Sequence, residues 1–280
     1  MEIRPMDNGC GAEIDGVDLQ SVSNEEVEAI ADAQADFGVV FLRNQTLTPD
    51  EQLAAARRFG PINVNRFFTP VPGHPQVAMV LKEPRHEHNV GGSWHTDHSY
   101  DQAPALGSML YALEVPGTGG DTLFASMYKA YEALSPGLRR TLAGLCAVHS
   151  SRHVFGEGAA YARHGDDRYH NAGKATQDAL HPMVIRHPRT GRPALYVNPG
   201  FTVRIDGWTD EESRPLLEYL YGVAAREEHT CRFRWEVGSV AFWDNRATWH
   251  YALNDYPGKR RLMHRVTVEG ETLSPYRAEG

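Results

Sequence analysis

Apolar residues recur with helical spacing in three segments, and each segment opens with a capping signal. Residues 23–26 (SNEE), 48–51 (TPDE) and 209–212 (TDEE) place Ser or Thr three positions before Glu, the pattern of a capping box. Helices are therefore expected to begin at these points. Gly38 would end the first helix, and the Gly60-Pro61 pair would end the second. 

Two further helical features carry proline. Pro215 lies inside the third helix, which is expected to start late or to kink because proline lacks the backbone N–H. Residues 128–145 also have a helical pattern, with a break expected at the Ser-Pro-Gly sequence 135–137. 

The remaining apolar residues fall into short runs rich in β-branched, aromatic and aliphatic side chains, most of them bounded by turn residues. Many short strands with a few helices predict a mainly β fold, a sandwich or jelly roll with flanking helices. The expected strands are 39–42, 77–81, 108–115, 122–124, 183–187, 194–197, 231–235, 240–243 and 262–268. 

Two polar stretches, 82–94 and 151–180, lack a strand or helix pattern. A loop as long as the second is uncommon inside a compact domain and is often a lid or a binding loop. A surface excursion without function fits the same residues. With no internal repeat in the sequence, we expect a single catalytic domain over residues 1–280, with a lid or insert at 151–180. 

Composition excludes several classes of protein. The 280 residues carry a net charge of -8 and no lysine-rich run, which argues against nucleic acid as a partner. No apolar stretch approaches the roughly 18 residues of a membrane span, and the N-terminus lacks a signal-peptide pattern, so a cytoplasmic location is expected. The three cysteines are far apart in the sequence and indicate neither a disulfide framework nor a thiolate zinc site. A small molecule is the expected partner. 

The first candidate for chemistry is the sequence Trp94-His95-Thr96-Asp97. In an extended strand, His95 and Asp97 project from the same face and can hold one metal ion. Alone, such a pair also fits an ordinary polar strand end. His250, far downstream, would complete two histidines and one carboxylate, the ligand set typical of non-haem iron(II) sites. Three coordination positions would stay open, two for a 2-oxo acid and one for dioxygen. 

Two arginines form a second candidate. Arg261 and Arg265 are four residues apart, so on a strand they lie on the same face. A buried arginine binds a carboxylate bidentately. Arg261 could therefore hold the distal carboxylate of 2-oxoglutarate, with help from the Thr122 hydroxyl. The alternative is that both arginines lie on the surface and pair with Asp255 or Glu269. 

Four segments together resemble the taurine dioxygenase family, which includes alkylsulfatase and aryloxyalkanoate dioxygenases. They are WHTD at 94–97, GGDTLF at 119–124, FWDNRATWHYALNDY at 242–256 and RRLMHRVTVEG at 260–270. The segments follow one another in the order found in the family. The resemblance extends over nearly the whole chain, because GAEIDGVDL, VVFLRNQ and HPRTGRPALYVN are also similar to family segments. 

The resemblance implies a double-stranded β-helix and an iron(II)-dependent hydroxylation that converts 2-oxoglutarate and O2 to succinate and CO2. It also implies a homo-oligomer, a dimer or tetramer. Because a carboxylate stands at Asp97, hydroxylation is expected instead of halogenation. The implied residues are His95, Asp97 and His250 for iron, Thr122, Trp243 and Arg261 for 2-oxoglutarate, and Arg265 for either cosubstrate or an anionic substrate. 

Departures from the family concern the substrate. Taurine-specific members carry histidine, tyrosine and asparagine where this chain has Asn65, Phe68 and Gly91, which argues against taurine. His98 after the ligand aspartate is also unusual. We therefore take Asn65, Phe68, His98 and Arg265 as candidate substrate contacts. The segments VHSSRHVFG and LYVNPGF are closer to the aryloxyalkanoate branch, and an aryloxyalkanoate, a sulfonate or a sulfate ester is the expected substrate type. 

Two other functions use the same ligands. A zinc hydrolase could be built on two histidines and a carboxylate, and a jelly-roll binding protein could keep the metal without turnover. Thr122 and Arg261 would have no purpose in the hydrolase, and they argue against the binding protein as well. His153, His164 and His170 are expected to be ordinary solvated loop histidines. 

Overall fold

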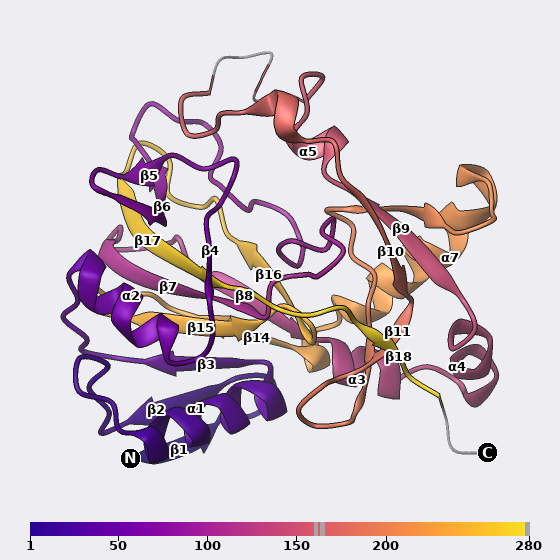
Figure 1. Cartoon of the computed structure of the whole chain (residues 1–280), viewed down its shortest axis with the longest axis horizontal. Helices are drawn as coiled ribbons and strands as arrows, with labels where there is room; N and C mark the ends of the chain where they lie inside the picture. The colour runs from indigo at the N-terminus through magenta and orange to yellow at the C-terminus, as the bar shows by residue number, and fades with distance from the viewer. Residues whose placement is uncertain (160–161, 163–165, 278–280) are drawn as a thin grey trace.

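The structure is a computed structural model, and it describes residues 1–159, 162 and 166–277. Strands form the centre of the molecule, and helices lie outside them (Figure 1). The α-helices are α1 (Asn24–Phe37), α2 (Pro49–Arg57), α3 (Met127–Glu132), α4 (Pro136–Leu142), α5 (Arg152–Phe155) and α7 (Asp210–Ala224). Short 3-10 helices are η1 (Ala172–Lys174) and η2 (Glu227–His229). 

One large sheet supports the site. Its strands run in the order β1-β2-β3-β15-β7-β17-β6-β5, and β4 pairs with β17 beside this path. All neighbours are antiparallel except β2 and β3, which are parallel. These strands are β1 (Glu2–Pro5), β2 (Ala12–Asp15), β3 (Val39–Leu42), β4 (Ile62–Asn63), β5 (Pro70–Val71), β6 (His74–Lys82), β7 (Gly107–Glu114), β15 (Val240–Asp244) and β17 (Arg261–Val268). 

Three smaller antiparallel sheets complete the described fold, in the orders β14-β8-β16, β10-β9-β13 and β12-β11-β18. The first of these carries part of the site. Their strands are β8 (Thr122–Ser126), β9 (Cys146–Ser150), β10 (Asp178–Pro182), β11 (Val184–Arg186), β12 (Pro193–Leu195), β13 (Thr202–Ile205), β14 (Thr230–Phe233), β16 (Thr248–Ala252) and β18 (Ser274–Pro275). 

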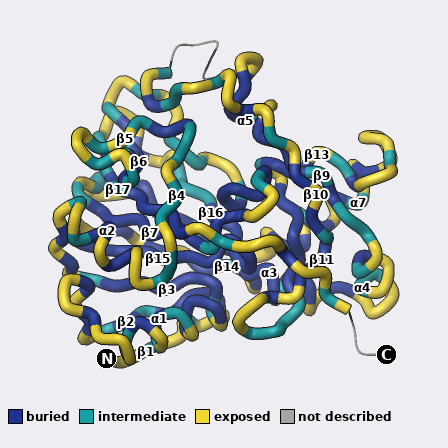
Figure 2. Tube along the Cα trace, in the orientation of Figure 1, coloured by how far each residue is buried: buried dark blue, intermediate teal, exposed yellow. Residues whose placement is uncertain are grey.

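Alternation along β15 shows how the layers pack. Val240 and Phe242 belong to the apolar cluster shared with α1 and α2 outside the large sheet. Ala241 and Trp243 point the other way and pack with Phe124 of β8, between the large sheet and β14-β8-β16. In Figure 2 the strands of this centre are largely dark blue, and exposed positions concentrate on helices and loops. A mainly β jelly roll with flanking helices is thus confirmed. 

The capping boxes are present as expected. The side chains of Ser23, Thr48 and Thr209 each accept a hydrogen bond from the backbone N–H of the glutamate three residues later. The carboxylate of that glutamate accepts a hydrogen bond from the backbone N–H of the Ser or Thr in return. The third helix does not start late: it begins at Asp210 and includes Pro215. The N–H that proline lacks would have reached the carbonyl of Glu211, which is exposed, so water can replace that bond. 

The sequence prediction missed nine strands, namely β1, β2, β4, β5, β9, β10, β13, β16 and β18. All nine are at most five residues long, and several carry polar residues at exposed positions, so they lack the apolar run by which a strand is predicted. The stretch 151–180, expected to be a loop, contains α5, η1 and the first residues of β10. Residues 160–161 and 163–165, with His164 among them, lie outside the described part. No helix in that part is long and apolar enough to cross a membrane. 

A buried ion network holds the end of β15. The Asp244 carboxylate is fully buried and accepts hydrogen bonds from Arg246 Nε at 2.9 Å and Nη2 at 2.6 Å. His187 Nε2 lies 3.0 Å from Oδ2 of the same carboxylate, the oxygen that also accepts from Arg246 Nη2. Burial alone would raise the pKa of Asp244, but Arg246 and His187 hold that pKa well below its usual value. The network fixes the segment that follows Trp243. 

We expect Asp244→Asn to destabilise the fold by about 3–5 kcal/mol at pH 7, because it leaves the Arg246 charge buried without its partner. Since the folded pKa of Asp244 is depressed, its contribution is present above the unfolded pKa of about 4 and is lost below it. The difference in urea unfolding free energy between the two proteins should therefore shrink from pH 7 to pH 3. Glu28→Gln, in an exposed pair with Arg189, should change stability by less than about 1 kcal/mol at either pH. A pH-independent difference would contradict this assignment. 

Candidate metal and cosubstrate site

A cavity of about 290 Å³ opens between the large sheet and β14-β8-β16. Its floor carries side chains from the strands β8, β15, β16 and β17, including Thr122, Trp243, His250 and Arg261. Residues 90–93 and 199–201 come from loops, and α5 contributes residues 153–155. All ten residues assigned to a site from the sequence line this single cavity: Asn65, Phe68, His95, Asp97, His98, Thr122, Trp243, His250, Arg261 and Arg265. 

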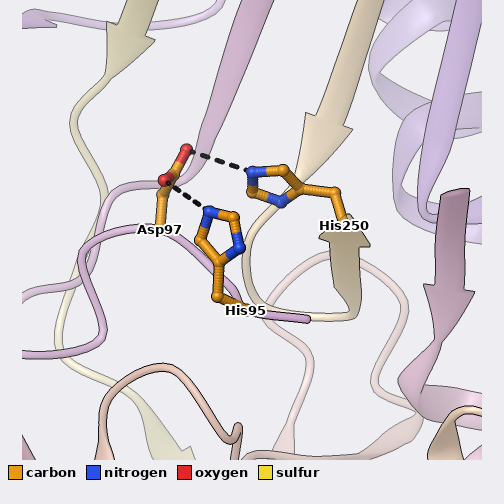
Figure 3. A group of neighbouring side chains, drawn as sticks. All are labelled: His95, Asp97 and His250. Carbon is orange, nitrogen blue, oxygen red and sulfur yellow. Dashed lines mark ion pairs between the residues drawn. The ribbon is translucent and has the colours of Figure 1, made fainter. Parts of the chain in front are cut away.

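His95, Asp97 and His250 point their polar ends toward one another (Figure 3). His95 Nε2 lies 3.7 Å from Asp97 Oδ1, and His250 Nε2 lies 3.9 Å from Asp97 Oδ2. One ligand atom from each residue can be chosen so that all three lie within 4.8 Å of one another. This spacing fits three ligands around a single ion. 

Backbone pairing brings the two histidines together. The N–H of His95 donates to the carbonyl of His250 at 3.1 Å, and the N–H of His250 donates back at 2.8 Å. The segment around Asp97 is not the regular strand expected from the sequence: the structure has one antiparallel bridge at His95, followed by a turn. His95 and Asp97 nevertheless project into the same cavity. 

Both imidazoles are prepared to give a nitrogen lone pair. Burial lowers the pKa of His95 and holds that of His250 well below its usual value, so both rings are neutral at physiological pH. His95 Nδ1 lies 2.8 Å from the Ser93 carbonyl, which can only accept. Nδ1 of His95 therefore carries the proton, and its Nε2 presents a lone pair toward Asp97. 

Asp97 is held as a carboxylate although its side chain is only 9% exposed. Burial would raise its pKa, but the charge of Arg265 keeps the pKa well below its usual value. Arg265 Nη1 donates to Oδ2 at 3.3 Å and to Oδ1 at 3.4 Å, and Ser108 Oγ donates to Oδ2 at 3.2 Å. The sequence placed Arg265 in the cavity correctly but gave no sign of its contact with Asp97, or of Ser108. 

At the other end of the cavity, Arg261 is buried with two unused donors. Its Nε and Nη2 have no hydrogen-bond partner among the described residues. Burial lowers the pKa of this guanidinium, and no carboxylate of the described residues forms an ion pair with it. Thr122 lies on β8 beside this end, and its Oγ1 accepts a 2.9 Å hydrogen bond from Trp235 Nε1. The surface alternative, with Asp255 or Glu269 as partner, is wrong for Arg261 because the side chain faces inward. 

Asn245, which the sequence analysis did not single out, joins the site residues from behind. Its Oδ1 accepts from Trp243 Nε1 at 2.9 Å and from the backbone N–H of Asp97 at 3.3 Å. The Trp243 ring in turn packs on His250, with 4.5 Å between ring centroids. The Asn245 side-chain oxygen thus holds the backbone of Asp97 directly and positions His250 indirectly, through the Trp243 ring. The only sequence signal was its place in the FWDNR segment. 

The cavity wall above the histidines is aromatic, with one polar stripe. Asn65 Oδ1 accepts from two backbone amides, which turns its Nδ2 toward His98 Nε2 at 3.4 Å. His98 Nε2 is therefore the acceptor, and its Nδ1 donates to Asp101 at 3.0 Å. Arg265 lies over the Phe68 ring, 4.4 Å from its centroid. The aromatic residues that line the cavity here are Phe68, Tyr100, Phe155, Tyr169 and Phe201. 

His153 and His170, which were expected to be solvated loop histidines, differ in their relation to the cavity. His153 lines the cavity, and its Nε2 donates to the Gly200 carbonyl at 2.8 Å. His170 is not among the lining residues. 

Comparison with known proteins identifies the family. Residues 2–267 match the family model described as "Taurine catabolism dioxygenase TauD, TfdA family". The chain belongs to the TauD/TfdA family. 

Two relatives and one solved structure match this chain along at least 90% of their own length. An alpha-ketoglutarate-dependent sulfate ester dioxygenase from Pseudomonas putida is 35% identical, covering 97% of this chain and 90% of the relative. An alpha-ketoglutarate-dependent 2,4-dichlorophenoxyacetate dioxygenase from Cupriavidus pinatubonensis is 32% identical, covering 92% of this chain and 93% of the relative. The crystal structure of a taurine dioxygenase from Burkholderia xenovorans is 36% identical, with a TM-score of 0.82 over 97% of this chain and 92% of that one. Iron(II), 2-oxoglutarate and O2 are the cofactor and cosubstrates that this membership implies. 

We expect Gly200→Ala to weaken metal binding about tenfold or more. A Cβ at this position would lie 2.7 Å from the Cβ of His95, so the imidazole or the turn must shift. Cobalt(II) titration, followed by the visible absorption of the bound ion, measures the change. Gly144→Ala serves as the control, because its new methyl group meets nothing within 4 Å. Equal cobalt affinity in Gly200→Ala and the wild type would show that the contact does not hold His95. 

Proposed function

We propose that the protein is an iron(II)- and 2-oxoglutarate-dependent dioxygenase that hydroxylates a C–H bond of a small anionic organic substrate. One observation carries the proposal. The cavity that holds two neutral imidazoles and a carboxylate also holds a buried arginine with two unpaired N–H donors. A metal site next to an unsatisfied cation fits a cosubstrate that chelates the metal at one end and carries a carboxylate at the other. 

The donor set fits iron(II). Two imidazoles and one carboxylate supply the facial arrangement of non-haem iron sites, which leaves coordination positions open. His95 and His250 are neutral and Asp97 is ionised, so the three groups need to release no proton to bind a divalent ion. We assign His95, Asp97 and His250 as the iron ligands. 

The opposite end fits the distal carboxylate of 2-oxoglutarate. Arg261 offers Nε and Nη2, and Thr122 offers a hydroxyl, so the groups there are donors that an acceptor-only carboxylate would satisfy. Trp243 lines the cavity between the two ends, against His250. A zinc hydrolase has no use for these unsatisfied donors, and this favours the dioxygenase. 

Each group then has a task in the reaction. Bound iron(II) supplies the oxidative chemistry, in which 2-oxoglutarate and O2 give succinate and CO2 as the substrate C–H bond is hydroxylated. Arg261 and Thr122 orient the cosubstrate. Arg265 keeps Asp97 ionised and presents the rest of its guanidinium to the cavity. The aromatic wall excludes water from the reacting carbon. 

The cavity favours an anion with an apolar body as substrate. Aromatic rings form much of its wall, and Arg265 is the cation on the substrate side. Asp97 is the one carboxylate among the described lining residues, and Arg265 already pairs with it. An ammonium group, as in taurine, would find no carboxylate partner there. We therefore propose an aryloxyalkanoate, sulfonate or sulfate ester with an uncharged apolar body, contacted by Asn65, Phe68, His98 and Arg265. 

Other features stay predictions from the sequence and the family. They are a homo-oligomer, a cytoplasmic location, and a lid formed by 151–180 within one catalytic domain. His153, Val154 and Phe155 from the start of this stretch do line the cavity, which is consistent with a lid. 

Oxygen consumption that depends on both iron(II) and 2-oxoglutarate tests the proposed function. Succinate should form in step with oxygen uptake when a substrate is present. His95→Ala and Asp97→Ala should abolish both, with the fold retained by circular dichroism. Hydrolysis of an ester by the zinc-loaded protein, with no oxygen uptake on any substrate, would overturn the proposal. 

Arg261→Ala should raise the apparent KM for 2-oxoglutarate about a hundredfold or more. Two hydrogen bonds to a charged carboxylate are lost, each worth about 1.5–3 kcal/mol. The KM for the organic substrate should change little. Arg260→Ala is the matched control: this neighbouring arginine pairs with Glu83 and Glu114 away from the cavity. Equal cosubstrate dependence in Arg261→Ala and the wild type would remove Arg261 from the site. 

Candidate substrates should differ in turnover according to whether they carry an ammonium group in addition to the anion. We expect turnover of aryl and alkyl anions, and at least a tenfold lower kcat/KM for taurine than for an alkylsulfonate of similar length, because the taurine ammonium must be desolvated without a partner. Coupled succinate formation measures each member. Taurine as the preferred substrate would contradict the proposed pocket chemistry. 

A further inference from the structure

Trp235 contacts both groups that we assign to the distal carboxylate, although it does not line the cavity. It follows β14 and is 5% exposed. Its Nε1 donates to Thr122 Oγ1 at 2.9 Å, and the Arg261 guanidinium lies over its ring, 5.6 Å from the centroid. One indole therefore supports two separate cosubstrate contacts from outside the cavity. 

The direction of the Trp235–Thr122 hydrogen bond is fixed by chemistry. An indole nitrogen can only donate, so Thr122 Oγ1 must accept from it. A threonine hydroxyl has a single proton, and that proton stays available for another acceptor. With the lone pair directed at Trp235, the O–H is left to point elsewhere. Thr122 is 4% exposed and lines the cavity beside Arg261. 

We infer that Trp235 is a positioning residue for the cosubstrate: it makes Thr122 a hydrogen-bond donor toward the distal carboxylate and supports the plane of Arg261. The inference rests on the proposed function. The ring and hydrogen-bond contacts of Trp235 with described residues are those with Phe233, Thr122 and Arg261, none of which is a candidate metal ligand or an aromatic residue of the cavity wall. Its removal should therefore affect binding of a distal carboxylate and leave the metal-chelating end unchanged. 

The side chain packs closely, so the substitution must keep its shape. Trp235 contacts the Phe233 ring edge-on at 4.9 Å between centroids, within the apolar cluster between the sheets. Trp235→Phe retains an aromatic ring and removes the N–H. Replacement by β-(3-benzothienyl)alanine, in which sulfur takes the place of the N–H, removes only the donor and serves if the phenylalanine variant does not fold. 

The direct test is calorimetric binding to the manganese(II)-loaded protein. N-Oxalylglycine, a 2-oxoglutarate analogue with a distal carboxylate, should bind Trp235→Phe about three- to tenfold more weakly than wild type, the cost of one buried hydrogen bond. Oxalate, which can chelate the metal but has no distal carboxylate, should bind both proteins equally. In turnover, KM for 2-oxoglutarate should rise by a similar factor while kcat and the substrate KM stay within twofold. 

A double-mutant comparison shows whether Trp235 acts through Thr122. Thr122→Val alone should weaken N-oxalylglycine binding, and adding Trp235→Phe should weaken it by less than in the wild-type background. Full additivity of the two effects, or equal loss of oxalate binding, would overturn the inference. Failure of the wild-type protein to bind N-oxalylglycine would instead defeat the proposed function, so the two failures are distinguishable. 

Discussion

The two backbone hydrogen bonds between His95 and His250 are the interaction on which the site depends. A residue pair that exchanges both bonds in an antiparallel arrangement has its side chains on one face and close together. The ring centroids of these two residues are accordingly 4.1 Å apart. A slip of one residue in this pairing would turn one imidazole to the opposite face and end the metal site. Asp97 lies beside the two histidines because it follows His95 by two residues. Its backbone N–H donates a hydrogen bond to Asn245 Oδ1, which holds it there. 

The balance between burial and neighbouring charges then sets the protonation states of Asp97, His95 and His250 in the absence of a ligand. Burial favours the protonated form of a carboxyl group, but the charge of Arg265 keeps Asp97 ionised. The imidazoles respond in the opposite direction, since burial favours their neutral form. Burial thus leaves two neutral imidazoles with lone pairs, and Arg265 keeps an anion beside them, which together are the ligand set that a divalent metal needs. Arg265 has a structural task here in addition to any contact with substrate. 

Local signals were enough for part of this arrangement. Capping boxes predicted the starts of α1, α2 and α7 because each is complete within four residues. Alternation along β17 correctly placed Arg261 and Arg265 on the same face of the strand, but it did not decide whether that face is buried or exposed. 

Features that depend on distant partners were not accessible from the sequence. The tautomer of His95 is set by the Ser93 carbonyl, and the ionisation of Asp97 by a side chain from another strand. Neither effect produces a pattern in the sequence from which it could be predicted. Trp235 was expected only as part of a strand, because the partner that gives it a role, Thr122, lies on β8. The short strands β9, β10 and β13 were missed because backbone pairing, not an apolar run, defines them. 

Under the proposed function, the contrast between the two arginines of β17 accounts for a preference for a dicarboxylic 2-oxo acid. Both are buried on the same face, yet Arg265 has a carboxylate partner and Arg261 keeps two N–H groups unpaired within the described structure. Each unpaired buried donor costs about 1–3 kcal/mol, and burial also lowers the pKa of this guanidinium. That cost is already present in the folded protein before any ligand arrives. A distal carboxylate relieves it without displacing a protein partner, whereas a 2-oxo acid without that group leaves it in place. On the proposed assignment, selectivity for the cosubstrate with a distal carboxylate follows from two unpaired donors that the fold keeps buried.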